Sequence, residues 1–257
     1  MRLFSDILRY RDLVRYLVLR ELKVRYRRSV IGFLWTMLQP LLMLLVFHVV
    51  FSAIFRFDVK NYPVYALAGI LFWNFFSQSI TTSMNSLRGN ASLLTKIPVP
   101  HVVFPVATTV SGVVNLLFAL IPLFAILVVT GHPLRPSLFF LPVSILIAAA
   151  FTLGAGLALS PLAVLFHDVV ELVAVLLTLL MYMTPTFYPM AILPDRFLWA
   201  VRFNPIRSIL EIFRDPIYLA KVPPVSHLTV AIGIAILALV AGSLIFRATS
   251  DRIALYA

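Results

Sequence analysis

RELKVRYRRSVIGFLWTMLQP, residues 20–40, begins as a basic run and continues without a break as an apolar one. Five of its first nine residues are Lys or Arg, and the apolar run extends to about residue 55. An apolar run of about 20 residues is long enough to cross a bilayer as a helix. Lys and Arg gather beside such runs on the cytoplasmic surface, where anionic lipids attract them. We therefore interpret this stretch as the point at which the chain leaves the cytoplasmic surface and enters the membrane.

The composition of the whole chain indicates an integral membrane protein. Of the 257 residues, 61% are hydrophobic, whereas soluble domains contain about 45–50% apolar residues. The apolar runs are about 20 residues or longer, which favours membrane helices over a β-barrel. Basic residues at the membrane surface account for the net charge of +11, so no nucleic-acid partner is expected. The absence of cysteine excludes disulfides and thiolate metal sites.

The sequence predicts an all-α integral membrane protein with six spans in a single transmembrane domain, residues 1–257. The spans are expected at about 31–55, 63–86, 102–130, 138–162, 169–188 and 227–246. Residues 1–29 have an apolar face containing Ile7, Val14, Val18 and Leu22, which predicts an amphipathic helix in the cytoplasmic interface. A basic tail that only orients the protein is the alternative. The domain thus divides into the interfacial helix (1–29), spans one to five (30–188), the short outer helices (189–226) and span six with the cytoplasmic tail (227–257).

The connection 189–226 is too short and too charged to cross the membrane twice. Its apolar residues at 206, 209, 210, 213 and 217 follow a helical spacing. We therefore predict short re-entrant helices in the outer leaflet, where irregular backbone requires a setting of protein or water.

The distribution of Lys and Arg predicts that both termini are cytoplasmic in the cell inner membrane. With the N-terminus inside, 13 of the 21 Lys and Arg residues lie on the cytoplasmic side, and nine of them precede the first span. The flank of the first span usually dominates orientation. An even number of spans then returns the C-terminus to the same side.

The predicted second span carries a continuous polar stripe. Asn74, Ser77, Gln78, Thr81, Thr82 and Asn85 share one helical face. Neutral hydrogen-bonding groups beside aromatic rings suit a sugar chain, so we predict that this span lines a channel, with Phe72, Trp73, Asn74, Phe76, Ser77, Gln78 and Thr81 as the lining residues. The alternatives are that the stripe joins helices by hydrogen bonds and that the aromatic residues form an interfacial belt.

The sequence offers little chemistry for an energy source or an enzyme. No G-x-x-x-x-G-K-[ST] motif occurs, and the five His residues are scattered. Ion-coupled carriers usually need ionisable residues inside the membrane, and the spans offer little beyond His48. We therefore expect no catalytic residue, bound cofactor or metal in this chain. If the protein drives uphill transport, the energy must come from another subunit.

Three segments together resemble the membrane subunits of ABC-2 type polysaccharide exporters, a family that includes O-antigen, capsule and teichoic acid exporters. The first is RELKVRYRRSVIGFLW with the following QP. The second is TPTFYPMAILP, 184–194, which is similar to a Ser-Pro-x-x-Tyr-Pro segment with Thr184 in the Ser position. The third is FNPIRSILEIFRDPIY, 203–218, which is similar to an Asn-Pro element followed by an Arg. The resemblance covers essentially the whole chain.

The resemblance implies a homodimer of six-helix subunits joined to two copies of an ATPase subunit that bind ATP and Mg²⁺. It implies that the N-terminal helix and the loop 86–101 contact the ATPases, here through Arg20, Lys23, Arg25, Leu93, Leu94, Lys96 and Pro98. It also implies an outer gate in 189–226, with Tyr188, Pro189, Asn204, Pro205 and Arg214. The cargo would be a polysaccharide on a polyprenyl diphosphate lipid. From charge placement, we expect Arg25, Arg27, Arg28 and Arg88 to attract that diphosphate.

Other functions are compatible with the same residues. The nearest alternative is an ABC-2 exporter of teichoic acid, capsule, lipid or a small molecule. An integral membrane enzyme acting on polyprenyl phosphates would need a metal-binding or acid/base cluster, and a passive channel would need no ATPase partner. The loop 86–101 is equally compatible with an ordinary connection.

Overall fold

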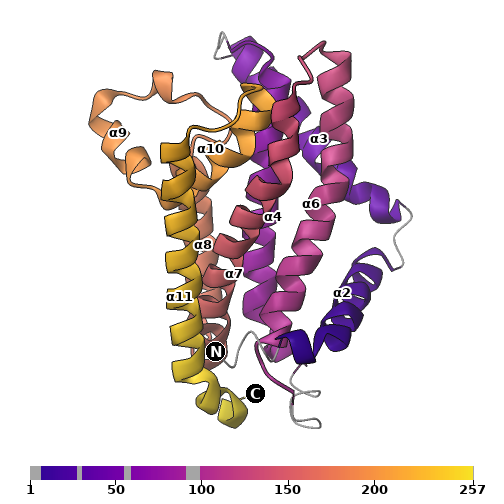
Figure 1. The fold of residues 1–257 in the computed structure, drawn as a ribbon, viewed down its shortest axis with the longest axis vertical. Coiled ribbons are helices and arrows are strands. Elements are labelled where there is room, and N and C mark those ends of the chain that lie inside the picture. Colours follow the sequence, from indigo (N-terminus) through magenta and orange to yellow (C-terminus); the bar gives the residue numbers. More distant parts are fainter. Residues whose placement is uncertain (1–6, 28–30, 55–58, 91–98, 257) are drawn as a thin grey trace.

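The computed structural model describes residues 7–27, 31–54, 59–90 and 99–256, and this part of the chain is helical without strands (Figure 1). The α-helices are α2 (Arg11–Tyr26), α3 (Trp35–His48), α4 (Tyr62–Ser86), α6 (Val103–Val129), α7 (Leu141–Leu165), α8 (Asp168–Met183), α9 (Asp195–Arg202), α10 (Pro205–Tyr218) and α11 (Val225–Tyr256). Short turns of 3₁₀-helix occur at Gly32–Leu34, Arg88–Asn90, Pro136–Phe140 and Met190–Ile192, and a π-helix at Val49–Ile54 extends α3. The all-α prediction is confirmed for the described residues.

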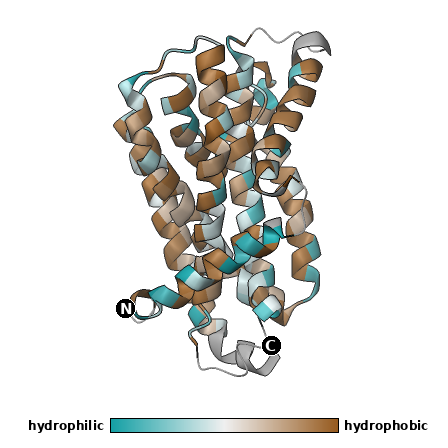
Figure 2. Ribbon diagram, turned by 90° about the vertical axis from the view of Figure 1, so that its right-hand side faces the viewer, coloured by the Kyte–Doolittle hydropathy of each residue, from teal (hydrophilic) through white to brown (hydrophobic). Residues whose placement is uncertain are grey.

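Four helical segments of the described chain are long and apolar enough to cross a membrane. They are Gly32–Phe51, Val103–Val129, Pro136–Leu165 and Val225–Thr249. Their outer faces are strongly apolar and exposed, as at Val129 and Leu237, which are 85% and 70% exposed. A soluble monomer rarely exposes so much contiguous apolar surface. Figure 2 shows these long helices mostly in brown, with teal residues gathered on the oblique helix beside the N-terminus.

The other two predicted spans correspond to α4 and α8. They differ from the four long apolar segments in polarity and in length, respectively. The polar stripe makes α4 less apolar, although it has 25 residues. The 16 residues of α8 extend only about 24 Å, less than the hydrocarbon thickness of about 30 Å. The six-span arrangement therefore stays a prediction.

Helix α4 forms the core of the described fold. Of its 25 residues, 18 are buried, and it packs against α3, α6, α7 and α10. Stacked or tilted rings link Phe72 to Phe213 of α10 and Phe76 to Phe151 of α7. Helix α4 is therefore enclosed by neighbouring helices along most of its length. It also extends from one end of the molecule to the other.

Helix α2 lies obliquely at one end of the bundle, here called the α2 end, and α9 and α10 lie at the opposite end (Figure 1). Leu17 and Val18 are buried in a separate apolar cluster with residues of α6, α7 and α11, and Val14 and Leu22 pack against it. The basic residues Arg11, Arg15 and Lys23 are exposed. The apolar face predicted for this segment thus packs against the bundle, and its position in the cytoplasmic interface stays a prediction.

The predicted short helices between the fifth and sixth spans are present as α9 and α10, and their insertion into the outer leaflet stays a prediction. Ile206, Ile209, Leu210, Phe213 and Ile217 are all at most 3% exposed, so the helical spacing read from the sequence marks the packed face of α10. The last helix, α11, continues to Tyr256 instead of ending near residue 246. After Gly242 the sequence contains no Gly or Pro to stop it.

Helices α7 and α11 approach each other closely where two glycines face one another. A Cβ on Gly242 would lie 2.0 Å from the carbonyl oxygen of Gly154, and a Cβ on Gly154 would lie 2.4 Å from the backbone of Ala238. Small residues at such contacts let membrane helices pack backbone to backbone.

Candidate functional site

The polar stripe forms the open face of an otherwise buried helix. Apart from Pro63 near its start, the residues of α4 that are not buried are Asn74, Ser77, Gln78, Thr81, Thr82 and Asn85. The hydroxyls of Ser77, Thr81 and Thr82 donate to carbonyls of the preceding turn, at 2.8–3.0 Å. Each hydroxyl oxygen keeps its acceptor capacity toward the open side. The face is thus polar without containing a formal charge.

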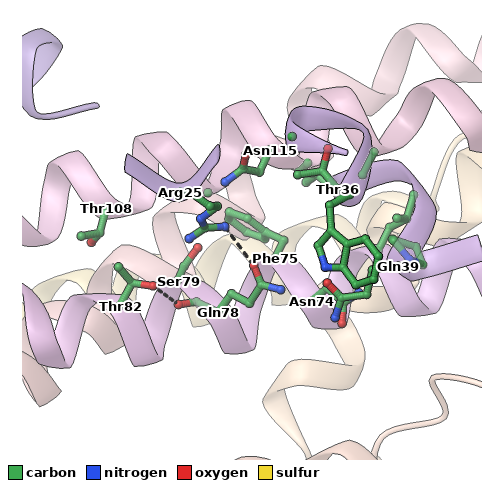
Figure 3. A pocket seen from close by; sticks show the side chains of 17 residues that line it. Arg25, Thr36, Gln39, Asn74, Phe75, Gln78, Ser79, Thr82, Thr108 and Asn115 are labelled. Atoms are coloured by element: carbon green, nitrogen blue, oxygen red, sulfur yellow. Dashed lines mark hydrogen bonds between the residues drawn. The ribbon is translucent and has the colours of Figure 1, made fainter. Parts of the chain in front are cut away.

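A cavity of about 140 Å³ lies beside the middle of this stripe. It is enclosed by the end of α2, the start of α3, α4 and α6, and Figure 3 shows polar side chains from all four pointing toward it. These side chains include Arg25, Thr36, Gln39, Asn74, Gln78 and Asn115. The buried hydroxyl of Ser79 also lines it and has no hydrogen-bond partner among the described residues. A water molecule or a cargo hydroxyl would satisfy that group.

Two arginines of α2, which packs on α6, reach polar side chains of α4 and of the turn that follows it. The Arg25 guanidinium donates to Oε1 of Gln78 at 3.2 Å, and Arg20 donates to Oδ1 of Asn90. Both contacts border a second groove between α2, α4 and α6, which also contains Glu21. Burial raises the pKa of the Glu21 carboxyl, against the lowering effects of a hydrogen bond to Ser111 and of the charges of Arg25 and Arg20. Of the residues predicted to couple to an ATPase, Arg25 therefore also contacts the polar face of α4, whereas Arg20 contacts the turn that follows α4.

The three aromatic residues predicted to line the channel lie inside the subunit. Phe72, Trp73 and Phe76 are only 1%, 6% and 4% exposed. The rings of Phe72 and Phe76 face α10 and α7, because 100° per residue rotates them away from the stripe. The Trp73 ring packs against Phe76. The prediction is wrong for these three in this conformation, whereas Asn74, Ser77, Gln78 and Thr81 do lie on the open face.

The other basic residues predicted at the inner end do not form one cluster. Arg88 contacts Nδ1 of His167 at 3.0 Å and the Val164 carbonyl at 3.4 Å, at the turn between α7 and α8. Lys23 is exposed on α2, and Arg27 is exposed directly after the end of α2. Arg28, Leu93, Leu94, Lys96 and Pro98 lie outside the described residues, so their predicted roles stay predictions.

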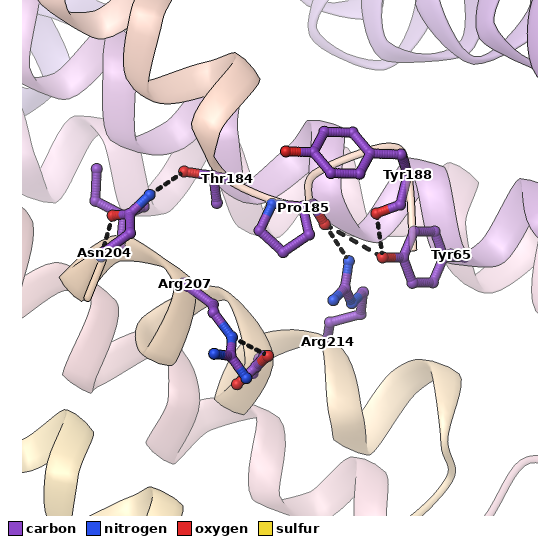
Figure 4. A network of polar contacts seen from close by, with 9 residues as sticks. Tyr65, Thr184, Pro185, Tyr188, Asn204, Arg207 and Arg214 are labelled. Atoms are coloured by element: carbon purple, nitrogen blue, oxygen red, sulfur yellow. Dashed lines mark hydrogen bonds and ion pairs between the residues drawn. The ribbon is translucent and has the colours of Figure 1, made fainter. Parts of the chain in front are cut away.

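At the opposite end, the segment 184–188 is held between α4 and α10 by hydrogen bonds, most of them to its backbone, a set of contacts here called the outer clasp after the predicted outer gate (Figure 4). Arg214 of α10 donates to the Pro185 carbonyl at 2.7 Å, and its guanidinium carbon lies 4.1 Å from the centre of the Tyr65 ring. The Tyr65 hydroxyl lies 2.9 Å from the Tyr188 carbonyl oxygen. The guanidinium is buried, with Arg214 only 7% exposed, so its hydrogen bond and ring contact are shielded from solvent.

Two further contacts complete the outer clasp. Asn204 caps α10 by accepting from the Ile206 amide, with Pro205 as the first helical residue, and its amide donates to the Thr184 hydroxyl at 2.9 Å. The Tyr62 hydroxyl donates to the Phe187 carbonyl at 3.0 Å. Of the predicted gate residues, Tyr188, Asn204 and Arg214 thus meet at one place, with Pro189 and Pro205 adjoining it.

The α4 half of the outer clasp was missed by the sequence analysis. Tyr62 and Tyr65 are three residues apart at the start of α4 and share a face. That spacing is the sequence signal from which a shared contact of the two tyrosines could have been predicted. Gly69, one turn further on, has its Cα against the Thr186 carbonyl, since a Cβ there would lie 2.1 Å from that oxygen.

Comparisons with known proteins identify the family of the chain. The family model for ABC-2 type transporters matches residues 12–218, from α2 to the end of α10. The chain belongs to the ABC-2 type transporter family. ABC-2 relatives include the O-antigen export system permease protein RfbA of Myxococcus xanthus, with 32% identity over 99% of this chain and 98% of that protein.

Two other relatives are named as export proteins for O-antigen and for capsule polysaccharide. The O-antigen export system permease protein RfbA of Klebsiella pneumoniae is 30% identical over 79% of each chain. The capsule polysaccharide export inner-membrane protein CtrC of Neisseria meningitidis serogroup B is 26% identical over 79% of this chain and 78% of that protein. Both the polar face of α4 and the outer clasp fall within the part matched by the family model.

Proposed function

We propose that this chain is the transmembrane subunit of an ATP-driven exporter that moves a polysaccharide such as O-antigen, built on a polyprenyl diphosphate lipid, across the inner membrane. The observation that carries the proposal is the open polar face of α4 on a helix that is otherwise buried. ABC-2 membership and the names of the relatives support the direction and the class of cargo.

The polar face cannot remain against lipid without cost. Amide and hydroxyl groups lose their hydrogen bonds to water in hydrocarbon, where little replaces them. A homodimer with a two-fold axis would bring equal faces together, so that the α4 stripes of both copies line one central path. Such a path presents amide and hydroxyl groups to the many hydroxyls of a sugar chain.

In this proposal the chain crosses the membrane six times, because α4 and α8 are spans in addition to the four most apolar segments. Helices α9 and α10 re-enter the outer leaflet. Both termini are cytoplasmic, so α2 lies at the inner surface with Arg20, Lys23 and Arg25 toward two ATPase subunits. The ATPases bind ATP and Mg²⁺, and this chain contributes no catalytic residue. Arg25 at the mouth of the cavity, with Arg27 directly after the end of α2, would attract the diphosphate of the cargo.

Helix α4 provides the mechanical link between the two ends. Its inner half contacts α2 through Gln78, and its outer half holds the segment 184–188 through Tyr62 and Tyr65. A shift of α2 upon ATP binding would therefore move the polar face and the outer clasp together. In this mechanism the 189–226 element acts as the outer gate.

Dependence on an ATPase tests the proposed function. The tagged chain, expressed with its companion ATPase subunit, should retain that subunit on purification. Replacing the P-loop lysine of the ATPase should stop polysaccharide export in cells. Normal export by that strain, or turnover of polyprenyl phosphates by the purified chain alone, would contradict the proposal.

Replacing polar groups of the α4 face tests the channel. Asn74→Leu together with Gln78→Leu removes hydrogen bonds worth about 1 kcal/mol each, so export should fall roughly thirtyfold. ATPase activity of the complex and dimer formation should change little. The measurement is polymer reaching the outside, with ATP hydrolysis recorded in the same membranes.

The matched control is Thr178→Leu, which removes an exposed hydroxyl from α8 instead of α4. Asn74→Leu alone tests the channel without removing the hydrogen bond between Arg25 and Gln78. Unchanged export, or dissociation of the dimer without any specific transport defect, would show that the stripe joins helices instead of lining a path.

A further inference from the structure

The first apolar span, Gly32–Phe51, is the least enclosed of the four long apolar segments. In its most apolar stretch 11% of the residues are buried, against 17% to 39% in the other three segments. The buried residues of α3 are Pro40 and Leu44, and the helix packs on α4 and α6. A segment with few buried contacts moves more easily than the core does. The position of α3 therefore depends on how its two ends are held.

The end of α3 near the outer clasp is held by an aromatic cluster around Phe187. The ring of Phe187 stacks on that of Phe47, with the ring centres 4.7 Å apart, and lies 6.0 Å from the ring of Phe51. The rings of Tyr182 and Tyr188 approach Phe187 at 6.1 and 6.0 Å. Phe187 is only 4% exposed, so its neighbours enclose it almost completely. A single side chain of the segment 184–188 thus contacts two rings of the first span.

The backbone of the first span changes from α-helix to π-helix at this contact. The π-helix, Val49–Ile54, includes Phe51, whose ring lies 6.0 Å from that of Tyr62 as well as from that of Phe187. π-helical turns are rare and are often found at functional sites. Helices bend at such turns and at proline, and α3 also contains Pro40 in its interior. The first span thus has two places at which it can bend, and one of them adjoins the outer clasp.

Phe187 joins two helices by different parts of the same residue. Its carbonyl oxygen accepts a hydrogen bond from the Tyr62 hydroxyl of α4 at 3.0 Å, whereas its ring stacks on Phe47 of α3. Helix α3 follows α2 in the chain, so a displacement of α2 also pulls on α3. Closely packed rings resist gradual deformation, and a contact of this kind is either kept or lost. Withdrawal of Phe47 would leave Phe187 held by its backbone and by the two tyrosine rings alone.

We infer that Phe187 is a positioning residue that fastens the first span to the outer gate and keeps the gate closed until α3 moves. This role rests on the proposed function, because it adds a second route from α2 to the gate beside the route through α4. In this role the side chain of Phe187 binds no cargo. It sets the position of the segment 184–188 through its contact with Phe47.

A double-mutant cycle tests the contact between Phe47 and Phe187. The chain is purified with its ATPase in nanodiscs without ATP, and the rate of protease cleavage within 184–194 is measured. Phe187→Leu and Phe47→Leu should each accelerate cleavage roughly fivefold, because each removes the same stacked pair. The double variant should be little faster than Phe187→Leu alone. Phe139→Leu, at an 88% exposed position before α7, should have no effect. Accelerations that multiply in the double variant would overturn the inference.

Leakage through the closed transporter separates a gating role from a purely structural one. The complex is reconstituted without ATP into liposomes that contain a small polar dye. Phe187→Leu should release the dye roughly fivefold faster than the wild type, in proportion to the larger open fraction, whereas Phe187→Tyr keeps the ring and should retain the dye. Unchanged leakage in Phe187→Leu would overturn the inference, because the ring would then stabilise the segment without closing a path.

Failure of this inference is distinct from failure of the proposed function. Neither the cleavage rates nor the dye leakage involve cargo or ATP hydrolysis. Export that stops when the ATPase is inactivated, together with unchanged leakage in Phe187→Leu, would contradict the role of Phe187 alone. Export that continues without an active ATPase would contradict the proposed function, whatever the leakage.

Discussion

Arg214→Leu should release the segment 184–188 and stop export. The substitution removes a buried charged donor from the Pro185 carbonyl and a guanidinium from the face of the Tyr65 ring. A hydrogen bond to a charged group and a desolvated cation–π contact together correspond to about 2–4 kcal/mol. Leucine fills some of the space but leaves the carbonyl with only the Tyr65 hydroxyl, at 3.3 Å, as a donor. The measurements are the thermal transition of the protein in nanodiscs and protease cleavage within 184–194.

A second arginine on the same helix provides the control. Arg207 forms an ion pair with Glu211 at 2.7 Å, one turn away on α10, and is more exposed than Arg214. Arg207→Leu should cost less than about 1 kcal/mol, because pairs of this kind contribute little. Equal losses of stability in the two variants would show that the contacts of Arg214 in the outer clasp stabilise the protein no more than the ion pair of Arg207 does. Arg214→Lys, which keeps the charge but loses the planar donors, should lie between them.

Gly242→Leu should separate α7 from α11 and prevent stable folding. A Cβ at this position would lie 2.0 Å from the Gly154 carbonyl oxygen, and backbone atoms cannot yield as the end of a side chain can. Overpacking of a tight contact costs about 1–3 kcal/mol and sometimes more, and here the whole of α11 must move. We expect a loss of about 3 kcal/mol or more, seen as low yield of monodisperse protein and a lower thermal transition.

The matched control is Gly233→Leu on the same helix. A Cβ there meets nothing within 4 Å, and the position is exposed. Leucine also favours helix over glycine by roughly 1 kcal/mol, so stability should be unchanged or slightly higher. If Gly242→Leu behaved like Gly233→Leu, the close approach of α7 and α11 would not be required for the fold.

The elements of the fold were largely predictable from the sequence. Continuous apolar runs predicted most ends of the long helices to within a few residues, although α11 extends well beyond its predicted end, and the spacing from Ile206 to Ile217 identified the buried face of α10. The end of α8 was placed too late because Thr184 and Pro185 leave the helix to join the outer clasp. The polar stripe was also identified correctly as one face of α4.

The sequence by itself determined that the chain is helical, apolar enough for a membrane, basic at its N-terminal end and polar along one face of α4. These properties follow from composition and periodicity, which each segment carries independently of its neighbours. Only the tertiary structure decided that this face is the open one, that Phe72, Trp73 and Phe76 are buried, and that Tyr65 meets Tyr188 and Arg214. Periodicity shows which residues share a side of a helix, but packing between segments far apart in the chain decides what that side touches.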